Sequence, residues 1–242
     1  MSFTVKTSLL ENSDGSAQLI TGDIKLIASV SGPIEPKPRQ ELPNVASLEI
    51  VIRPAVGLSG TREKALEDKL RSLLQAVIVR YKYPRQLIQV VIQFLSTPLT
   101  KYQGGAYSNH KDEVEYSNIE LNAAINGCYF ALVDAGIALY SSFASVCISL
   151  TEDHQTIDEE PEYIIDPNLK QLHKSDSHHV ICFNIEDKKA NKILLLESLG
   201  DFTEEQLFTV ISKAVTQCEL IHNDYQRKYI TEKIDNDYVW KA

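Results

Sequence analysis

The segment from Ser117 to Gly136 places the tightest constraint on the fold of this chain. Ser117 and Glu120 have the spacing of a helix capping box, and apolar residues then recur at helical intervals until Gly136. Several positions between them carry small side chains, which let a helix approach its neighbour closely: Ala123, Ala124, Gly127, Ala131 and Ala135. We therefore predict a helix over residues 117–136 that packs closely against a β-sheet.

Strand patterns occur on both sides of this helix. They cover residues 17–20, 24–30, 47–53, 87–95, 143–150, 163–165, 180–185 and 192–197. Two further helices are predicted, one over Thr61–Val79 with Thr61 as its N-cap and one after a second capping box that begins at Asp201. Helices and strands follow one another without regular βαβ alternation, so the sequence predicts an α+β fold with mixed sheets and long packed helices.

The length of the chain favours a single folded unit. With 242 residues, 43% of them hydrophobic, the chain can bury a core without disulfides, and we predict one domain over residues 1–242. Residues 96–116 and 151–162 are expected to form surface loops, and residues 228–242 a polar tail that is either helical or frayed. No apolar run approaches the roughly 20 residues that a membrane span requires, so we expect no membrane contact.

Charge and cysteine usage limit the kinds of partner. The net charge is −9, and six of the negative charges fall between Thr151 and Glu162. Free-standing nucleic-acid-binding proteins are usually basic, so we expect at most a local contribution to a shared basic path. The four cysteines form no Cys-X-X-Cys pair and lie among apolar residues, which predicts buried thiols and no zinc site. His178 and His179 begin a strand and should point to opposite faces, so together they form no metal site.

The sequence lacks the usual motifs of a self-sufficient catalyst. It contains no G-x-G-x-x-G or Walker loop for phosphate and no G-x-S-x-G nucleophile elbow. Residues 57–60 and Arg62 would suit an anion, although glycines before a helix more often only turn the chain. Asp166 is a lone carboxylate at a strand end, where a turn residue is the ordinary interpretation. The residues alone predict a cytosolic or nuclear α+β domain without a complete active site of its own.

Four segments nevertheless resemble one known family. They are Asp14–Ala17 with Gly22–Ile27, similar to an E/DGS…GDTKV hairpin, Gly32–Pro43, similar to the loop after it, Leu121–Gly136, similar to an AAINAA…ALADAG helix, and Ile164–Pro167, similar to a strand end that bears an aspartate. This combination, coherent over residues 10–226, resembles the RNase PH family, in particular the members that form the ring of the eukaryotic RNA exosome.

The resemblance implies a fold and an assembly. It implies a fold like domain 2 of ribosomal protein S5 and a ring of six RNase PH-like subunits, with S1/KH cap subunits, a separate processive hydrolytic nuclease subunit, and RNA in the central channel. It implies a location in the nucleus, nucleolus and cytoplasm, and we expect neither a cofactor nor a metal. The candidate RNA contacts are Arg62, Lys64, Arg39 and Lys37.

The resemblance fails at the positions that carry activity. Active members bind phosphate with a Gly-(Thr/Ser)-Arg segment, where this chain has Ile119, Glu120 and Leu121, and a carboxylate would repel phosphate. They also carry a second aspartate six residues after the one matched by Asp166, where this chain has Leu172. The resemblance thus implies a catalytically inactive structural subunit that helps form the channel for 3′–5′ RNA processing and degradation. The alternatives are a phosphate-dependent 3′–5′ exoribonuclease whose site is completed by a partner subunit, and a binding module, for example a homodimer, outside the ring.

Overall fold

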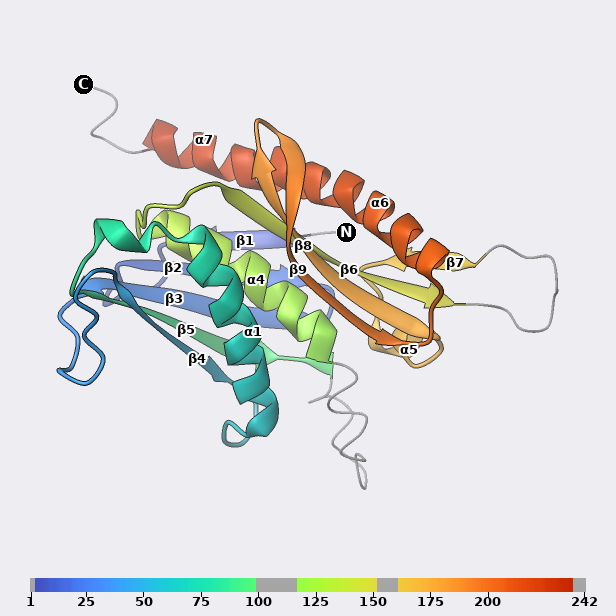
Figure 1. The fold of residues 1–242 in the computed structure, drawn as a ribbon, viewed down its shortest axis with the longest axis horizontal. Coiled ribbons are helices and arrows are strands. Elements are labelled where there is room, and N and C mark those ends of the chain that lie inside the picture. The colour runs from blue at the N-terminus through green and yellow to red at the C-terminus, as the bar shows by residue number, and fades with distance from the viewer. Residues whose placement is uncertain (1–2, 99–116, 152–160, 237–242) are drawn as a thin grey trace.

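The computed structural model describes residues 3–98, 117–151 and 161–236, which form two β-sheets around a central helix (Figure 1). The first sheet has the order β1-β2-β3-β5-β4, with β1 (Phe3–Thr7), β2 (Gly15–Thr21), β3 (Ile24–Ile34), β4 (Ser47–Arg53) and β5 (Leu87–Ser96). The second sheet has the order β7-β6-β8-β9, with β6 (Ser142–Thr151), β7 (Glu162–Ile165), β8 (Ser177–Glu186) and β9 (Lys189–Gly200). All neighbouring strands are antiparallel except β4 and β5, so the predicted α+β fold with mixed sheets is confirmed.

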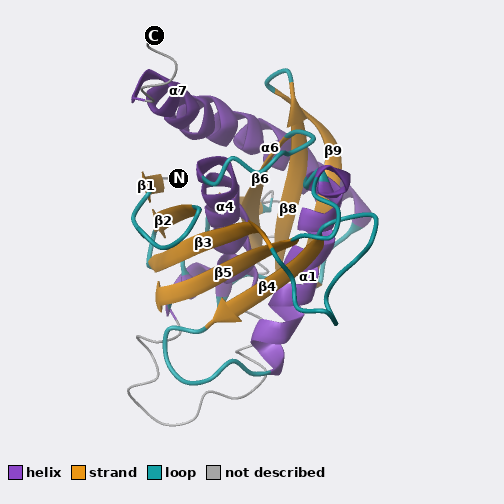
Figure 2. Ribbon diagram, turned by 90° about the vertical axis from the view of Figure 1, so that its left-hand side faces the viewer, coloured by secondary structure: helices purple, strands orange, loops and turns teal. Residues whose placement is uncertain are grey.

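The central helix is α4 (Ser117–Asp134), and its first sixteen residues are all buried. It contacts β2 and β3 of the first sheet and β6 and β8 of the second, and Figure 2 shows it between the two sheets. Gly127 explains part of this close packing, because a Cβ atom there would lie 2.7 Å from Leu26 Cδ1. Gly15 on β2 approaches the helix even more closely, since its Cβ would lie 2.3 Å from the backbone nitrogen of Ala135. The predicted close packing of this helix is therefore confirmed, on two sheets rather than one.

Two further long helices pack against the sheets. α1 (Thr61–Val77) joins β4 to β5, while α6 (Glu204–Ile221) packs on β6, β8 and β9. A short 3-10 turn, η1 (Arg80–Lys82), follows α1, and α5 (Leu169–Leu172) is a single turn after β7. One continuous cluster of buried apolar side chains includes residues from both sheets and from α1, α4 and α6.

Several element ends differ from the prediction. The N-cap of α1 is Gly60 rather than Thr61, since the Glu63 carboxylate accepts the Gly60 N–H at 2.6 Å. The N-cap of α6 is Thr203 rather than Asp201, because the Thr203 hydroxyl accepts the N–H of Gln206, the third residue of the helix. After α6, a π-helical turn, η2 (His222–Gln226), leads into α7 (Arg227–Asn236). The described part of the predicted polar tail is therefore helical, which is one of the two states expected for it.

The predicted surface loops lie mostly outside the described residues. Residues 99–116 and 152–160 belong to these stretches, so the predictions for loops 96–116 and 151–162 concern parts that the structure does not describe. The strand β1 had no counterpart in the prediction, and it pairs along its full length with β2. Within the described ranges, no helix is long and apolar enough to span a membrane.

Candidate functional site

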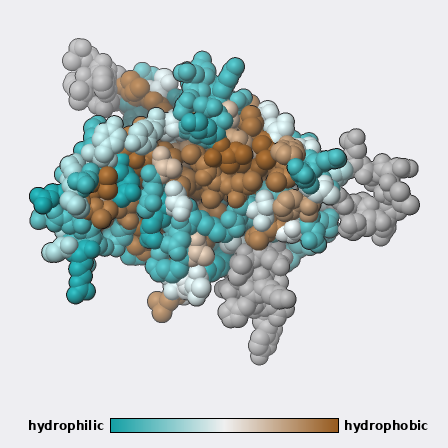
Figure 3. Space-filling view, viewed as in Figure 1, coloured by the Kyte–Doolittle hydropathy of each residue, from teal (hydrophilic) through white to brown (hydrophobic). Residues whose placement is uncertain are grey.

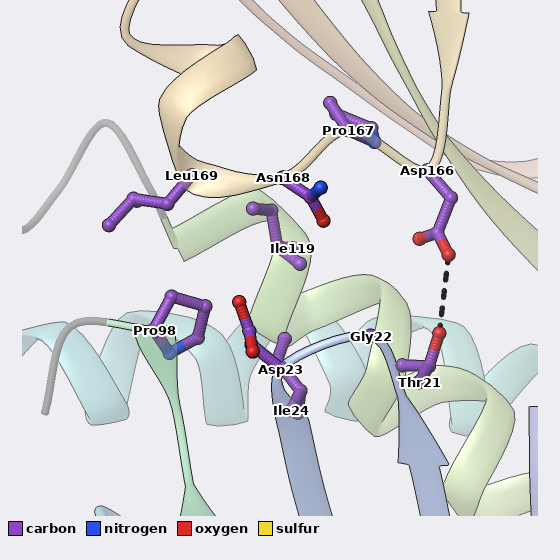
Figure 4. Close-up of a pocket in the computed structure, with 10 residues that line it drawn as sticks. All are labelled: Thr21, Gly22, Asp23, Ile24, Pro98, Ile119, Asp166, Pro167, Asn168 and Leu169. Atoms are coloured by element: carbon purple, nitrogen blue, oxygen red, sulfur yellow. Dashed lines mark hydrogen bonds between the residues drawn. The ribbon is translucent and has the colours of Figure 1, made fainter. Parts of the chain in front are cut away.

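A small cavity lies where the β2–β3 turn meets the segment after β7 (Figure 4). Its lining residues come from four parts of the chain: Thr21, Gly22, Asp23, Ile24, Pro98, Ile119, Asp166, Pro167, Asn168 and Leu169. The volume is about 20 Å³, which is room for roughly one water molecule. A phosphate or a nucleotide does not fit into this space as it stands.

Asp166 is the one acidic group at this cavity that the sequence singled out. The backbone holds it in a left-handed conformation, with φ at 56°, and its N–H donates to the Cys147 carbonyl at 2.8 Å. The Thr21 hydroxyl donates to the Asp166 carboxylate at 3.3 Å, as drawn in Figure 4. Burial raises the pKa of Asp166, and the Thr21 bond opposes this only in part. Nothing in the sequence pointed to Thr21, because 145 residues separate it from Asp166.

The position of the missing second acid is apolar and closed. Leu172 ends the single turn α5, is only 3% exposed and belongs to the buried core. It does not line the cavity, so nothing at this position pairs with Asp166. Asp23 is the other acidic residue among the described residues that line the cavity, and the lining that the structure describes contains no lysine or arginine to hold an anion.

Glu120 is held by an ion pair that the sequence did not predict. The Arg62 Nη2 atom at the start of α1 donates to Glu120 Oε2 in the first turn of α4 at 2.6 Å. Glu63 lies on the other side of the guanidinium, with 3.4 Å between Arg62 Nη1 and Glu63 Oε1. Burial raises the pKa of Glu120, and the opposite charge and hydrogen bond of Arg62 counter this rise without cancelling it. Arg62 is 18% exposed, so its charge is directed mainly to carboxylates of the same chain.

The two residues beside Glu120, at the positions where active family members bind phosphate, are apolar. Ile119 lines the cavity and is almost fully buried, and Leu121 is fully buried in the core. Neither side chain offers a hydrogen-bond donor to an anion. The three positions predicted to be degenerate thus comprise two apolar side chains and one carboxylate that already has a cationic partner.

The four candidate RNA contacts do not lie together. Arg62 and Lys64 lie in the first turn of α1. This turn is at the same end of the first sheet as the cavity, which is lined by Ile24, the first residue of β3. Lys37 and Arg39 follow the opposite end of the 11-residue strand β3, roughly 33 Å away along the strand. The four side chains of one chain therefore do not form a single contiguous path.

These cations also differ in their surroundings. Lys64 is 65% exposed, and its Nζ atom lies 2.6 Å from the buried carboxylate of Glu67. Lys37 and Arg39 are exposed on the loop between β3 and β4. Exposed lysine and arginine side chains can reach a phosphate backbone, whereas Arg62 would first have to leave Glu120.

The described residues hold no group of three or more His, Cys, Asp or Glu side chains that could bind a metal. His179 instead lies between the hydroxyls of Ser177 and Ser198, at 3.1 and 2.8 Å, and contacts the ring of Phe202. Burial lowers its pKa to about 4, so the ring is neutral near pH 7. The four cysteines are all buried free thiols, as predicted.

Comparisons with known proteins agree with this architecture. Residues 2–138 match the 3′ exoribonuclease family, domain 1, and residues 145–217 match its domain 2. The chain is 43% identical to the exosome complex component RRP46 of Saccharomyces cerevisiae over 226 residues, covering 92% of this chain and 93% of that protein. It is 31% identical to the exosome complex component rrp46 of Schizosaccharomyces pombe, covering 88% and 83%. The crystal structure of rice Rrp46 has a TM-score of 0.74 and 26% identity, covering 93% of each chain.

Proposed function

Because the chain belongs to the 3′ exoribonuclease family, also called the RNase PH family, we propose that it is a ring subunit of the RNA exosome of the RRP46 type. Two relatives at 43% and 31% identity carry the name of exosome components, and both are covered over most of their length. In this proposal, the chain helps form the central channel through which RNA passes during 3′–5′ processing and degradation.

We further propose that the subunit has no phosphorolytic activity of its own. The observation that carries this proposal is the ion pair between Arg62 and Glu120, in which a carboxylate of the chain takes the charge of the arginine beside the first turn of α4. A phosphate dianion arriving there would meet a negative or a neutral side chain, not a free cation. Leu172 supplies no second acid, and a cavity of about 20 Å³ admits no nucleotide.

The proposal names the partners by class. They are other RNase PH-like subunits in a six-membered ring, S1/KH cap subunits, and a processive hydrolytic nuclease subunit that does the cutting. The particle would act in the nucleus, the nucleolus and the cytoplasm. The shared core between the two matched family regions supports a single folded unit over residues 1–242.

For RNA contact we favour the exposed cations over Arg62. Lys64 at one end of the first sheet and the pair Lys37 and Arg39 at the other would touch different parts of an RNA path. Charge reversal at Lys64 and, separately, at Lys37 with Arg39 should each weaken protection of RNA by the assembled ring. A pair of variants that both protect RNA like the wild type would remove these residues from the path.

The alternative is a phosphate-dependent exoribonuclease whose site is completed by a partner. A rice relative, 24% identical over 97% of this chain, carries the name exosome complex exonuclease RRP46 homolog, which is the observation in its favour. Purification of native complexes through this chain tests the ring proposal. We expect a multi-subunit particle with other RNase PH-like chains, and recovery of the chain as a lone monomer or as a homodimer would contradict it.

A further inference from the structure

Two tyrosine rings lie exposed beside each other at one end of the molecule. Tyr81, in η1, is 65% exposed, and Tyr140, in the connection between α4 and β6, is 60% exposed. Their ring centroids are 6.3 Å apart, with 48° between the ring planes. Aromatic side chains contribute strongly to binding when a ligand covers them, so an exposed pair of rings marks a candidate binding surface.

Backbone hydrogen bonds hold the segments that carry the two rings. The Val79 N–H donates to the Ala138 carbonyl at 2.9 Å, and the Tyr140 N–H donates to the Val77 carbonyl at 2.9 Å. The Ala138 N–H donates in turn to the Tyr83 hydroxyl at 3.1 Å. The end of α1 and the connection after α4 are therefore fixed to each other. A ligand that covers the rings would pay little to order the chain beneath them.

Cations accompany the tyrosine pair. The run from Arg80 to Arg85 includes a third cation, Lys82, and no acidic residue. Lys82 is exposed, and its Nζ atom lies 5.9 Å from the ring centroid of Tyr83. Arg85 is 72% exposed, and its Nε atom lies 3.0 Å from the exposed Glu41 carboxylate. Exposed ion pairs contribute little free energy, so Arg85 can exchange Glu41 for a phosphate of a ligand.

The connection between β3 and β4 adds two more cations at this end. The Arg85 N–H donates to the Leu42 carbonyl at 3.2 Å, which ties the run after α1 to the connection that carries Lys37 and Arg39. Figure 1 shows the connections α1–β5, β3–β4 and α4–β6 together at the left-hand end, away from α5. Within the described ranges, Lys37, Arg39 and Lys82 form no ion pair. We call the surface formed by four residues at this end the tyrosine platform: Tyr81, Tyr140, Lys82 and Arg85.

We propose that the tyrosine platform binds single-stranded RNA, with an unpaired base stacked on the two tyrosine rings and the neighbouring phosphates held by Lys82 and Arg85. Every base has a π-face that stacks on tyrosine, and lysine and arginine pair with phosphate. Residues 34–42 and 80–86 carry five cations and two acidic residues, in a chain whose net charge is −9. Figure 3 shows this end as largely hydrophilic, unlike the apolar surface in the middle of the same face. Local positive charge beside exposed rings favours a polyanion that carries aromatic groups, which is the chemistry of RNA.

The platform is separate from the cavity and from Lys64, which lie at the other end of the 11-residue strand β3. The inference deepens the proposed function and rests on it for the biological role, because a ring that processes RNA would supply the ligand. Binding of RNA by the isolated chain does not require the ring. Recovery of the chain outside any ring particle would therefore contradict the ring proposal alone, and a failure to bind RNA would contradict the platform alone.

Fluorescence anisotropy of a labelled oligouridine of about 12 nucleotides, titrated with the purified full chain, tests the platform. At about 50 mM salt we expect a dissociation constant of roughly 1–100 µM. Tyr81→Ala and Tyr140→Ala should each raise this constant by about 5-fold or more, because each removes stacking surface. Tyr81→Phe should change it by less than about 2-fold, since the ring remains. The matched control is Phe208→Ala, which removes a 61% exposed ring from α6 and should also change it by less than about 2-fold.

The salt dependence of binding separates phosphate contacts from stacking. Each phosphate contact to a single strand contributes about 0.7 to the slope of log affinity against log salt concentration. Lys82→Gln and Arg85→Gln should therefore each weaken binding and reduce the slope by about 0.7, whereas Tyr81→Ala should leave the slope unchanged. The control Lys228→Gln removes an exposed charge from α7 and should change neither the affinity nor the slope.

Three outcomes would overturn the proposal: no binding by the wild-type chain in this range, equal effects of Tyr81→Ala and Phe208→Ala, or a Tyr81→Phe variant as weak as Tyr81→Ala. If an alanine variant fails to fold, the slopes of Lys82→Gln and Arg85→Gln decide, and unchanged slopes would overturn the proposal. Loss of a protein subunit from native particles of the double variant Tyr81→Ala/Tyr140→Ala, with the RNA affinity of the chain unchanged, would assign the platform to a protein neighbour and overturn it as well.

Discussion

Replacing Arg62 by leucine should expose how strongly the buried Glu120 carboxylate depends on its one observed cationic partner. Glu120 is almost fully buried, and its pKa is raised by that burial even with Arg62 only 2.6 Å away. Leaving a buried carboxylate without a counter-charge costs about 3–5 kcal/mol, and partial protonation of Glu120 reduces this, so we expect about 2–4 kcal/mol at pH 8. For a chain of this size, that corresponds to a fall in melting temperature of roughly 5–12 °C.

The raised pKa of Glu120 also determines how the free energy of unfolding depends on pH. A carboxyl whose pKa is raised in the folded state lowers stability as pH rises from its ordinary value of 4.5 through the folded pKa, because the folded state then holds the extra proton. Arg62→Leu removes an influence that lowers this pKa, so the window extends to higher pH. The loss of stability relative to the wild type should therefore be large at pH 8 and small near pH 5.

Urea denaturation at both pH values, with two further variants, completes the test. The double variant Arg62→Leu/Glu120→Leu should recover most of the stability, because it removes the buried charge together with its partner. The control Arg71→Leu breaks an exposed pair with Asp68 and should cost less than about 0.5 kcal/mol at either pH. A loss below about 1 kcal/mol at pH 8, or the same loss at both pH values, would refute the reasoning.

Three further predictions concern the packing and the buried groups. In a denaturation experiment, Gly15→Ala should lower the free energy of unfolding by about 3 kcal/mol or more, since the added Cβ meets backbone atoms. Gly127→Ala should lower it by about 1 kcal/mol, because the Leu26 side chain can move. Equal losses would contradict the packing described. Burial alone would raise the pKa of Asp134, but the Ser16 amide and other donors hold this pKa below its ordinary value. Asp134→Asn should therefore lower the free energy of unfolding by about 1–3 kcal/mol at pH 7. The difference from the wild type should fade as the pH falls below about 4. A thiol reagent should modify none of the four cysteines before the protein unfolds, and fast labelling of the native chain would show that the core opens.

The sequence predicted best those elements whose pattern is local. The strand β4 was predicted with its observed bounds, Ser47–Arg53, because β-branched residues lie between clear breaks. Helix α4 was predicted from a capping box and a run of small and apolar residues. It begins at Ser117, the residue predicted as its cap, and ends at Asp134, two residues before the predicted end. Capping residues were harder, since several polar residues precede each helix and the backbone conformation decides which of them caps it, as at Gly60 and Thr203.

The candidate site required contacts between distant residues, which no local pattern reveals. Arg62 and Glu120 are 58 positions apart, and the sequence singled out both without indicating that they meet. The split of the RNA candidates has a similar cause, because the strand β3 carries Lys37 and Arg39 to the far end of the sheet from Lys64. The family resemblance supplied the positions to examine, and the three-dimensional structure supplied their partners.

Whether this subunit is inactive on its own can be tested by measuring the phosphate-dependent release of nucleoside diphosphates from RNA. The assay should use the purified chain, with Arg62→Leu as the companion variant and a range of phosphate concentrations. We predict no release above background at any phosphate concentration, for the chain and for the variant alike, because Glu120 pairs with the Arg62 cation and Leu172 supplies no acid. Release that rises with phosphate and disappears in Arg62→Leu would contradict the inactivity proposed for this subunit and would establish the chain as a phosphorolytic enzyme.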